Sequence, residues 1–357
     1  MVCTLIMAVL VVACARDQAE EAPAPAEQEV AEEPAAEEVE ADATDEVADD
    51  VADVEGGYRI GVTYLDLTNP VWAENANRIA EVAPERYNAT VTILDAQNDP
   101  ALQVTQIENF IADGVDAIIV GAVDPAAIYD VTQRALDAGI VVMAFGVNID
   151  NYTLDLTAQQ YDAGWANGTK AAAWINEHLD GVAQVGLLGH PEVEVLIVRA
   201  QGIIDALAHY APGAEIVIEA SAVTPDVGMA AAENFLMAFP EMMVIVCIGD
   251  GGAIGANAAV MAAGRDSDEF GIFSVDATVE AMQSIANNEP IRMSVSFGPG
   301  WLIGEQILEL TMIAVRGEPF ESTNYLPVMP VDRSNLVEML EFWGMTDDVD
   351  TSRMIVP

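Results

Sequence analysis

The amino-acid sequence predicts an α/β protein made of two Rossmann-like, doubly wound lobes. From residue 58 onward, short apolar runs alternate with segments of helical periodicity. Near-continuous apolar runs suit strands that are buried on both faces of a parallel sheet. Nine such runs are too many for one modest domain, and the 357 residues of the chain also exceed the usual length of one domain. We therefore expect two sheets, each covered by helices.

The boundaries of the expected helices follow from capping residues. Asp124 and Pro125 provide an N-cap and a first-turn proline before AAIYDVTQRALDA, and Gly139 ends that helix. The segment ALQVTQIENFIADG has apolar residues at helical spacing and closes on a glycine. The apolar runs expected as strands are YRIGVTYL, TVTILDA, DAIIVGA, IVVMAFG, AQVGLLG, EIVIEAS, MMVIVCIGD, FGIFSVD and RMSVSF.

Residues 1–14 are expected to direct export. The first 13 residues, MVCTLIMAVLVVA, form an apolar run that is too short for a transmembrane helix. The run ends in VVAC, in which the cysteine is Cys14, and charged residues follow. This pattern resembles a bacterial lipoprotein signal, although it lacks the basic n-region of a secretory signal. We predict a protein that is lipid-anchored at Cys14, at the outer face of the cytoplasmic membrane or in the periplasm.

Residues 15–57 are expected to form a disordered acidic linker. They contain 17 acidic residues, one basic residue and no aromatic residue. Such a segment buries too little apolar surface to offset the loss of conformational entropy on ordering.

The charge of the whole chain excludes some classes of partner. Acidic residues number 59 against 12 basic ones, which gives a formal net charge of -47. Nucleic acid and anionic membrane surfaces would be repelled. We therefore expect no nucleic-acid partner, and contact with the membrane through the lipid anchor only.

The three cysteines predict no structural disulfide. Cys3, Cys14 and Cys247 have spacings that give no framework of pairs. Cys247 lies in the apolar run MMVIVCIG, so we expect a buried free thiol.

No motif indicates a catalytic residue, a cofactor or a metal site. The sequence lacks a phosphate-binding Gly-x-x-x-x-Gly-Lys-Ser/Thr loop, and its first expected strand is not followed by Gly-x-Gly-x-x-Gly. It also lacks a Gly-x-Ser-x-Gly nucleophile elbow. The histidines, His178, His190 and His209, are too scattered for metal-ligand spacing.

The fold class selects candidate ligand loops without any motif. In doubly wound sheets, ligands bind outside the carboxyl ends of the strands. The loops that follow the expected strands are 66–72, 96–99, 122–124, 145–148, 189–194, 250–252 and 276–278.

The order of several segments resembles type I periplasmic binding proteins of the ribose/galactose group. GVTYLDLTNPVW, residues 61–72, resembles their first strand and the Asn-Pro-aromatic loop after it. LDAQNDP and DAIIV resemble the end of their second strand and their third strand, and Gly249-Asp250 and VDAT resemble their second-lobe ligand loops. The similarity covers about residues 58–330.

The resemblance implies two lobes that are joined by a three-strand hinge and close on a ligand. The chain would cross between the lobes near 157–160, 296–298 and 326–329. The expected N-terminal lobe is 58–157 with 298–326. The expected C-terminal lobe is 158–297 with 327–357, including the tail.

The same resemblance suggests ligand contacts. Asn69 and Trp72 match the polar and aromatic contacts of the first loop, and Asp250 and Asp276 match second-lobe acids that accept hydrogen bonds from hydroxyls. Each of these residues also has an alternative role that is purely structural. Asn69 would be a turn residue, Trp72 a core anchor, and the two aspartates helix caps.

Other family positions differ in this chain. After the fourth strand, FGVN at 145–148 replaces the Asp-Arg pair of the ribose type. The arginine expected early in a second-lobe helix falls near Ile197, with Arg199 two residues on, and the hinge glutamine falls near Phe297.

Sugar chemistry completes the predicted site. Sugars present hydroxyls in the plane of the ring and C–H groups on its faces, so amides and carboxylates suit the edge and aromatic rings suit the faces. The candidate ligand-binding residues are Asn69, Trp72, Gln97, Phe145, Asn148, Asp250 and Asp276.

The predicted ligand is small and neutral, such as a sugar, polyol or nucleoside. No candidate loop contains Lys or Arg, and Arg199 on a nearby helix is the one exception considered. A ligand carboxylate or phosphate would face Asp250 and Asp276 without a fixed cation. Burying an unpaired charge in this way costs on the order of several kcal/mol.

The sequence therefore favours a monomeric substrate-binding lipoprotein of an ABC importer, which delivers a monosaccharide to a membrane permease. One alternative is a sensory receptor that presents its ligand to a membrane kinase or chemoreceptor, and neighbouring transporter genes would separate the two. Another is a hydrolase on the same fold that uses the two aspartates.

The lipidation signal yields a direct prediction. Cys14→Ser should move the protein from the membrane fraction to the soluble fraction, because it removes the only predicted anchor. Fractionation with immunoblotting measures this, and recovery of the variant in membranes at the wild-type level would contradict it.

Overall fold

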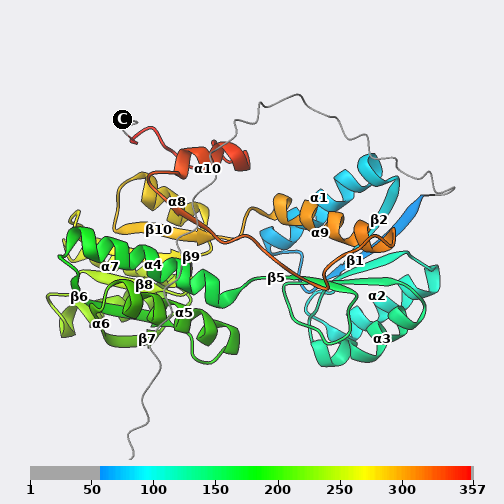
Figure 1. The fold of residues 1–357 in the computed structure, drawn as a ribbon, viewed down its shortest axis with the longest axis horizontal. Helices are drawn as coiled ribbons and strands as arrows, with labels where there is room; N and C mark the ends of the chain where they lie inside the picture. Colours follow the sequence, from blue (N-terminus) through cyan, green and yellow to red (C-terminus); the bar gives the residue numbers. More distant parts are fainter. Residues whose placement is uncertain (1–56, 355–357) are drawn as a thin grey trace, which may run out of the picture. The chain divides into compact units, whose positions relative to one another are not determined.

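The computed structural model describes residues 57–354, which form two lobes, each built on one sheet (Figure 1). Within this range each sheet has six strands with helices on both faces. The predicted α/β fold with two doubly wound lobes is confirmed. The predicted signal at 1–14 and nearly all of the predicted linker at 15–57 lie outside the described residues. In the part of the chain that is described, no helix combines the length and the apolar character needed to cross a membrane.

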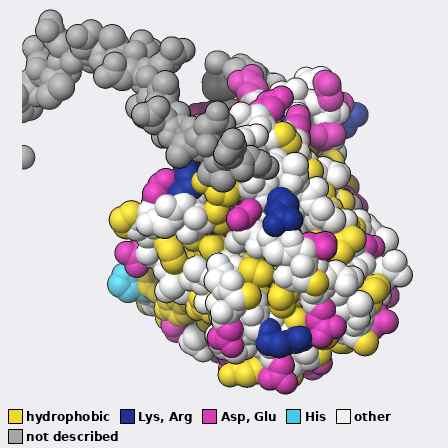
Figure 2. Space-filling view, turned by 90° about the vertical axis from the view of Figure 1, so that its right-hand side faces the viewer, with side chains coloured by type: hydrophobic (Ala, Val, Ile, Leu, Met, Phe, Trp, Pro, Cys, Tyr) yellow, Lys and Arg dark blue, Asp and Glu magenta, His cyan; other side chains and the backbone are white. Residues whose placement is uncertain are grey.

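Acidic side chains dominate the charged surface. On the face shown in Figure 2, they are spread among apolar and other side chains, and basic side chains appear in only a few places. This distribution follows from the composition, with 59 acidic and 12 basic residues in the whole chain.

The first sheet is parallel throughout, in the order β11-β5-β4-β3-β1-β2. On one face, Ile79 of α1 and Ile307 of α9 pack in one buried cluster with strand residues. On the other face, Ile107 of α2 and Ile128 of α3 do the same. The strands are β1 (Tyr58–Tyr64), β2 (Ala89–Asp95), β3 (Ala117–Gly121), β4 (Val141–Phe145), β5 (Leu154–Thr157) and β11 (Thr323–Tyr325). The helices are α1 (Pro70–Tyr87), α2 (Pro100–Asp113), α3 (Pro125–Asp137) and α9 (Gly300–Val315).

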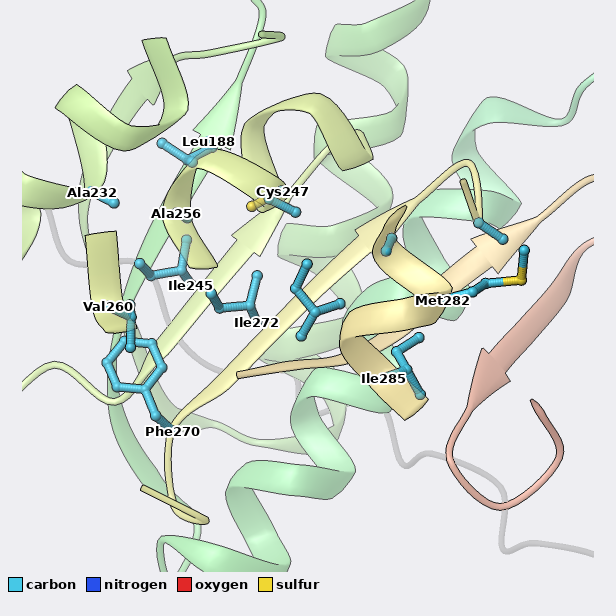
Figure 3. Packing of buried hydrophobic residues seen from close by; sticks show 14 of the residues in the cluster. Leu188, Ala232, Ile245, Cys247, Ala256, Val260, Phe270, Ile272, Met282 and Ile285 are labelled. Atoms are coloured by element: carbon cyan, nitrogen blue, oxygen red, sulfur yellow. The ribbon is translucent and has the colours of Figure 1, made fainter. Parts of the chain in front are cut away.

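The second sheet has the order β12-β10-β9-β8-β6-β7, with β12 antiparallel to β10. Alternate residues of β8 face opposite layers. Val244 and Val246 pack with α4 and α5, whereas Ile245 and Cys247 pack with α6, α7 and α8 (Figure 3). The strands are β6 (Val182–Gly189), β7 (Gly213–Ser221), β8 (Val244–Cys247), β9 (Gly271–Val275), β10 (Ile291–Ser296) and β12 (Met329–Asp332). The helices are α4 (Gln160–His178), α5 (Glu194–Tyr210), α6 (Pro225–Ala238), α7 (Asp250–Ala262), α8 (Val279–Ala286) and α10 (Leu336–Trp343).

Several sequence signals match local structure. Asp124 caps α3 by accepting a hydrogen bond from the Ala126 amide, as expected. Gly114, at the end of α2, has a φ of 62°, a left-handed conformation that glycine adopts without strain. Cys247 is a buried free thiol, as predicted, and burial raises its pKa.

Three chain segments connect the two sheets. They join β5 to α4, β10 to α9 and β11 to β12. The predicted crossings near 157–160, 296–298 and 326–329 fall in these connections. The domain boundaries set at these positions remain our proposal.

Helices α4 and α5 approach each other at backbone distance because glycines line their contact. A Cβ at Gly164 would lie 1.9 Å from the carbonyl oxygen of Arg199, and a Cβ at Gly202 would lie 2.2 Å from that of Tyr161. Any side chain at either position would push the helices apart. This packing fixes the position of Arg199 relative to the start of α4.

Candidate ligand-binding site

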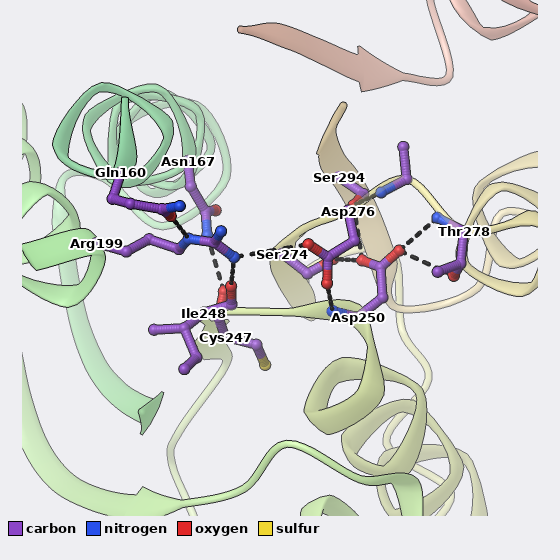
Figure 4. Close-up of polar contacts among 11 residues, drawn as sticks. Gln160, Asn167, Arg199, Cys247, Ile248, Asp250, Ser274, Asp276, Thr278 and Ser294 are labelled. Atoms are coloured by element: carbon purple, nitrogen blue, oxygen red, sulfur yellow. Dashed lines mark hydrogen bonds and ion pairs between the residues drawn. The ribbon is translucent and has the colours of Figure 1, made fainter. Parts of the chain in front are cut away.

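Asp250 lies at the carboxyl edge of the second sheet, where it is fully buried (Figure 4). Its Oδ1 accepts hydrogen bonds from the hydroxyls of Ser274 in β9 and Ser294 in β10. Its Oδ2 accepts from the amide and the hydroxyl of Thr278, at 2.6 and 2.9 Å. Burial raises the pKa of Asp250, and these donors oppose the shift. The carboxylate therefore ties together the ends of two strands and the start of α8.

Asp276, directly after β9, is the aspartate whose carboxylate is presented to solvent. Its side chain is 47% exposed. Its Oδ2 accepts a long hydrogen bond of 3.4 Å from the Asp250 amide. The φ of Asp276 is 114°, a left-handed value that is unfavourable for a residue with a side chain. Strain of this kind persists only where the surrounding structure holds it, and it is often found at functional sites.

Arg199 of α5 supplies the positive charge beside Asp276. Only 6% of Arg199 is exposed, and its Nη1 lies 3.6 Å from Oδ1 of Asp276. Nη1 also donates to the Ile248 carbonyl at 2.6 Å, and Nε donates to Oε1 of Gln160 at 2.8 Å. The guanidinium carbon lies 5.7 Å from the centre of the Phe297 ring. The arginine is thus held from four sides.

Sequence reasoning found no cation in the candidate loops, named Arg199 as the one exception and placed the family arginine near Ile197; the structure places Arg199 beside Asp276. α5 begins at Glu194, and Ile197 points outward with 48% of its surface exposed. Arg199, two residues later, lies on the buried side of the helix. Side chains two positions apart on a helix do not face the same way, so a small error in alignment exchanges an exposed residue for a buried one.

The charges of the site shift each other's pKa. Partial loss of solvent around its carboxylate, together with the nearby charge of Asp250, raises the pKa of Asp276 to about 6, and Arg199 opposes this. Burial lowers the pKa of Arg199, and the two aspartates oppose that shift. Near neutral pH the exposed carboxylate is therefore ionised, and the guanidinium compensates its charge.

The predicted aromatic residues of the first lobe form a cluster. The Trp72 ring packs edge-on against Tyr64 and Phe145, with centroid distances of 4.9 and 4.8 Å. Phe145 is only 5% exposed, whereas Trp72 is half-buried. The Trp72 ring covers Gly121 and Gly146, where a Cβ would lie 2.4 and 2.6 Å from it. Phe145 therefore belongs to the core beneath Trp72, and Trp72 is the aromatic residue nearer the surface.

The predicted amides of the first lobe are all exposed. Asn69 is exposed and caps α1 by accepting from the Val71 amide at 3.0 Å. Gln97 is exposed in a left-handed turn, and its backbone N–H donates a hydrogen bond to the Asp95 side chain. Asn148 is also exposed.

Asn148 and Gln160 line the same cavity, of about 710 Å³, which also contacts Asp155, Thr157, Val195 and Tyr325. Because Gln160 also holds Arg199, this cavity adjoins the charged network. Asn148 thus shares a cavity with Gln160, which contacts Arg199.

The main residues that sequence reasoning missed are polar groups next to apolar strands. Ser274 and Ser294 each interrupt an apolar run, FGIFSVD and RMSVSF. A lone hydroxyl at a buried strand position needs a partner, which is the signal that would have identified them. Gln160 carried no comparable signal. Among residues 57–354, no group of three His, Cys, Asp or Glu side chains is arranged to hold a metal ion.

Two doubly wound sheets, three connecting segments and polar groups at the strand ends define a two-lobed binding protein. The model of the periplasmic binding protein domain matches residues 60–319, and the chain belongs to this family.

Similar proteins and structures agree with this assignment. A Rhizobium meliloti protein named for rhizopine binding is 33% identical over 269 residues, which are 73% of this chain and 86% of that protein. The ribose import binding protein of Bacillus subtilis is 27% identical over 76% of this chain and 86% of its own length. The crystal structure of a Bacillus halodurans ABC transporter solute-binding protein with bound myo-inositol has a TM-score of 0.65 and 25% identity. The match covers 80% of this chain and 98% of that one.

The charge network predicts the titration of Asp276. Carboxyl ¹³C NMR should give it an apparent pKa of about 6. Arg199→Gln should raise this pKa because it removes a nearby cation, and Asp250→Asn should lower it because it removes a nearby anion. Glu177→Gln, at the opposite edge of the sheet, is the control and should leave it unchanged. Titration of Asp276 near the ordinary value of about 4 in all these proteins would refute the network.

Proposed function

We propose that this protein is the extracytoplasmic receptor of an ABC importer and that it binds a neutral monosaccharide or ring-shaped polyol. The observation that carries the proposal is the Asp276 carboxylate, half-exposed at the carboxyl edge of the second sheet and charge-compensated by the buried Arg199. An ionised carboxylate accepts hydrogen bonds from two or more ligand hydroxyls. Hydrogen bonds to a charged acceptor are stronger than those between neutral groups.

Arg199 provides a donor as well as a counter-charge. Its Nε and Nη1 are occupied by Gln160, Ile248 and Asp276, whereas Nη2 has no protein acceptor among the described residues. The site on the second lobe thus combines an acceptor with a donor. Neighbouring hydroxyls on a sugar or polyol ring match such a pair, because each hydroxyl both donates and accepts.

The expectation of a neutral ligand now rests on a different physical argument. A fixed cation is present, but Asp276 already compensates it. A ligand carboxylate or phosphate would have to compete with Asp276 for Arg199 while lying close to two acidic groups. Such a ligand would weaken the interaction between Arg199 and Asp276 and would add repulsion between its own charge and the acidic groups. A micromolar ligand has only about 8 kcal/mol of binding free energy in total.

The similar proteins support a polyhydroxylated ligand. The Bacillus subtilis relative is a ribose import protein, and the similar Bacillus halodurans structure contains myo-inositol. At 145–148 this chain has FGVN instead of the Asp-Arg pair of the ribose type, so its first lobe offers the amide of Asn148 instead of a charge pair. We infer that the ligand has the hydroxyls of a sugar or cyclic polyol, with a first-lobe contact that is not that of ribose.

The structure also weakens the hydrolase alternative. That alternative needs Asp250 and Asp276 as a catalytic acid–base pair. Both oxygens of Asp250 accept hydrogen bonds from protein groups, and the side chain is fully buried. A carboxylate in this position is not presented to a substrate, which favours binding without catalysis.

The proposed receptor also needs a membrane anchor, a tether and a permease. We propose that Cys14 carries the lipid anchor, that residues 15–57 serve as the acidic tether, and that the monomer delivers its ligand to a membrane permease. The membership of the periplasmic binding protein family supports an extracytoplasmic location.

The proposed ligand class can be tested by calorimetry with ribose, allose, myo-inositol, galacturonate and ribose 5-phosphate. At least one neutral compound should bind with a Kd of about 1 μM or below, and the two anions should bind at least about a hundredfold more weakly. Asp276→Asn should weaken the best neutral ligand by about tenfold or more, because it removes a charged acceptor. Glu280→Gln, on the exposed first turn of α8, is the matched control and should bind like the wild type.

Two results would contradict the proposal. One is tighter binding of galacturonate or ribose 5-phosphate than of every neutral compound. The other is an Asp276→Asn variant that binds the best ligand with wild-type affinity.

A further inference from the structure

A second cavity, of about 390 Å³, lies at the amino-terminal edge of the second sheet. It adjoins Ile291 and Arg292, the first residues of β10, and Asp332 to Ser334 at the end of the antiparallel β12. The C-terminal half of α4 and the end of α8 complete its wall. Asp276 follows the carboxyl end of β9 in the same sheet, so the cavity is separated from the proposed sugar site by the length of the strands.

The cavity concentrates positive charge in a protein that has little of it. Three of the chain's 12 basic residues line it, namely Lys170, Arg292 and Arg333. Lys170 forms an ion pair with Asp332 at 2.8 Å. Within residues 57–354, neither Arg292 nor Arg333 has a carboxylate within 4.0 Å.

These two arginines are held by neutral groups instead. Arg292 donates to the carbonyl oxygens of Phe270 and Ser267, both at 2.9 Å. Arg333 donates to the carbonyl oxygens of Ile285, at 3.0 Å, and of Ala286. Backbone carbonyls fix the position of a guanidinium without cancelling its charge.

The two guanidinium groups are close enough to influence each other. Burial lowers the pKa of Arg292, the charge of Arg333 lowers it further, and Asp268 opposes both. Asp268 does not line the cavity, and the acids that do are Asp332, which Lys170 neutralises, and Glu177. Three cations therefore face two carboxylates, and the excess positive charge is concentrated at Arg292 and Arg333.

The rest of the wall is apolar and partly aromatic. The Arg292 guanidinium lies over the indole of Trp174, with 4.9 Å between its carbon and the ring centre. Phe273, Ile291 and Met293 contribute apolar side chains. The volume falls in the range of cavities that hold small ligands, which combine an apolar lining with a few placed polar groups.

We propose that this cavity is a second ligand site, which binds a small organic anion through Arg292 and Arg333. A carboxylate or phosphate group of the ligand pairs with the two guanidinium groups, and a flat apolar body packs beside Trp174. Guanidinium groups suit both anions because their N–H donors match the oxygens of either one. This inference is independent of the sugar-binding proposal, because it concerns the opposite edge of the sheet.

Calorimetry on the full chain at low ionic strength tests the site with four probes. Phenyl phosphate and benzoate combine a flat ring with either anion, inorganic phosphate has the charge alone, and benzyl alcohol has the ring alone. At least one of the first two should bind with a Kd of about 1 mM or below. Inorganic phosphate and benzyl alcohol should each bind about tenfold more weakly than the better of these two, because each lacks one half of the interaction.

Variants locate the binding. Arg292→Gln and Arg333→Gln should each weaken the better aromatic anion by about tenfold or more, since each loses a charged hydrogen bond. Arg265→Gln is the matched control. Arg265 also donates to a backbone carbonyl, that of Met242, and lies over a ring, that of Phe270, but it does not line the cavity. This control should bind like the wild type.

A further variant keeps the test decisive if an arginine variant does not fold. Ala173→Leu fills the cavity without changing charge and should abolish binding.

The proposal is overturned if neither aromatic anion binds to the wild type with a Kd of about 1 mM or below. It is also overturned if Ala173→Leu binds normally, or if folded Arg292→Gln and Arg333→Gln both bind normally. Competition between an aromatic anion and a bound neutral sugar would place the anion in the other site and would equally refute it.

Discussion

The buried carboxylate of Asp250 is the constraint on which the second-lobe site depends. An ionised group without solvent contact is unfavourable unless polar partners surround it, and here hydroxyls of β9 and β10 and the start of α8 supply them. Because these elements converge on one side chain, their ends are held in register. The backbone of Asp276 is thereby held at its positive φ, and the carboxylate of Asp276 stays at the surface. Asp250 thus holds the carboxyl edge of the second sheet in the arrangement that leaves the Asp276 carboxylate accessible to a ligand.

Arg199 gives the arrangement its charge balance. It reaches the strand ends because α5 packs against α4 at backbone distance, which glycines at 164 and 202 permit. Its contacts with Gln160 and Ile248 fix the guanidinium beside Asp276 before any ligand arrives. A preorganised donor and acceptor lose little entropy on binding, which favours a ligand whose hydroxyls match their spacing. The same sheet carries uncompensated arginines at its other edge, so its two edges suit ligands of different charge.

Sequence reasoning reached the fold because apolar runs, prolines and capping residues are local signals. It also selected the strand-end loops that contain Asp250 and Asp276, which lie at the carboxyl edge of the second sheet. It could not tell which aspartate is buried, because the deciding hydroxyls, Ser274 and Ser294, come from other strands. It named Arg199 as the only candidate cation but aligned the family arginine with Ile197. The side of a helix on which a residue lies depends on where the helix starts, and a shift of two positions reverses the answer.

We propose that the ligand contacts Asp276 and Arg199. Asp250 only holds the strand ends in place and does not contact the ligand. A crystal structure of the complex with the best neutral ligand tests this most directly. We expect a ligand hydroxyl within hydrogen-bond distance of an Asp276 carboxylate oxygen, with the bonds from Ser274, Ser294 and Thr278 to Asp250 intact. A ligand that hydrogen-bonds to the Asp250 carboxylate, or that binds without contact to Asp276, would contradict the account.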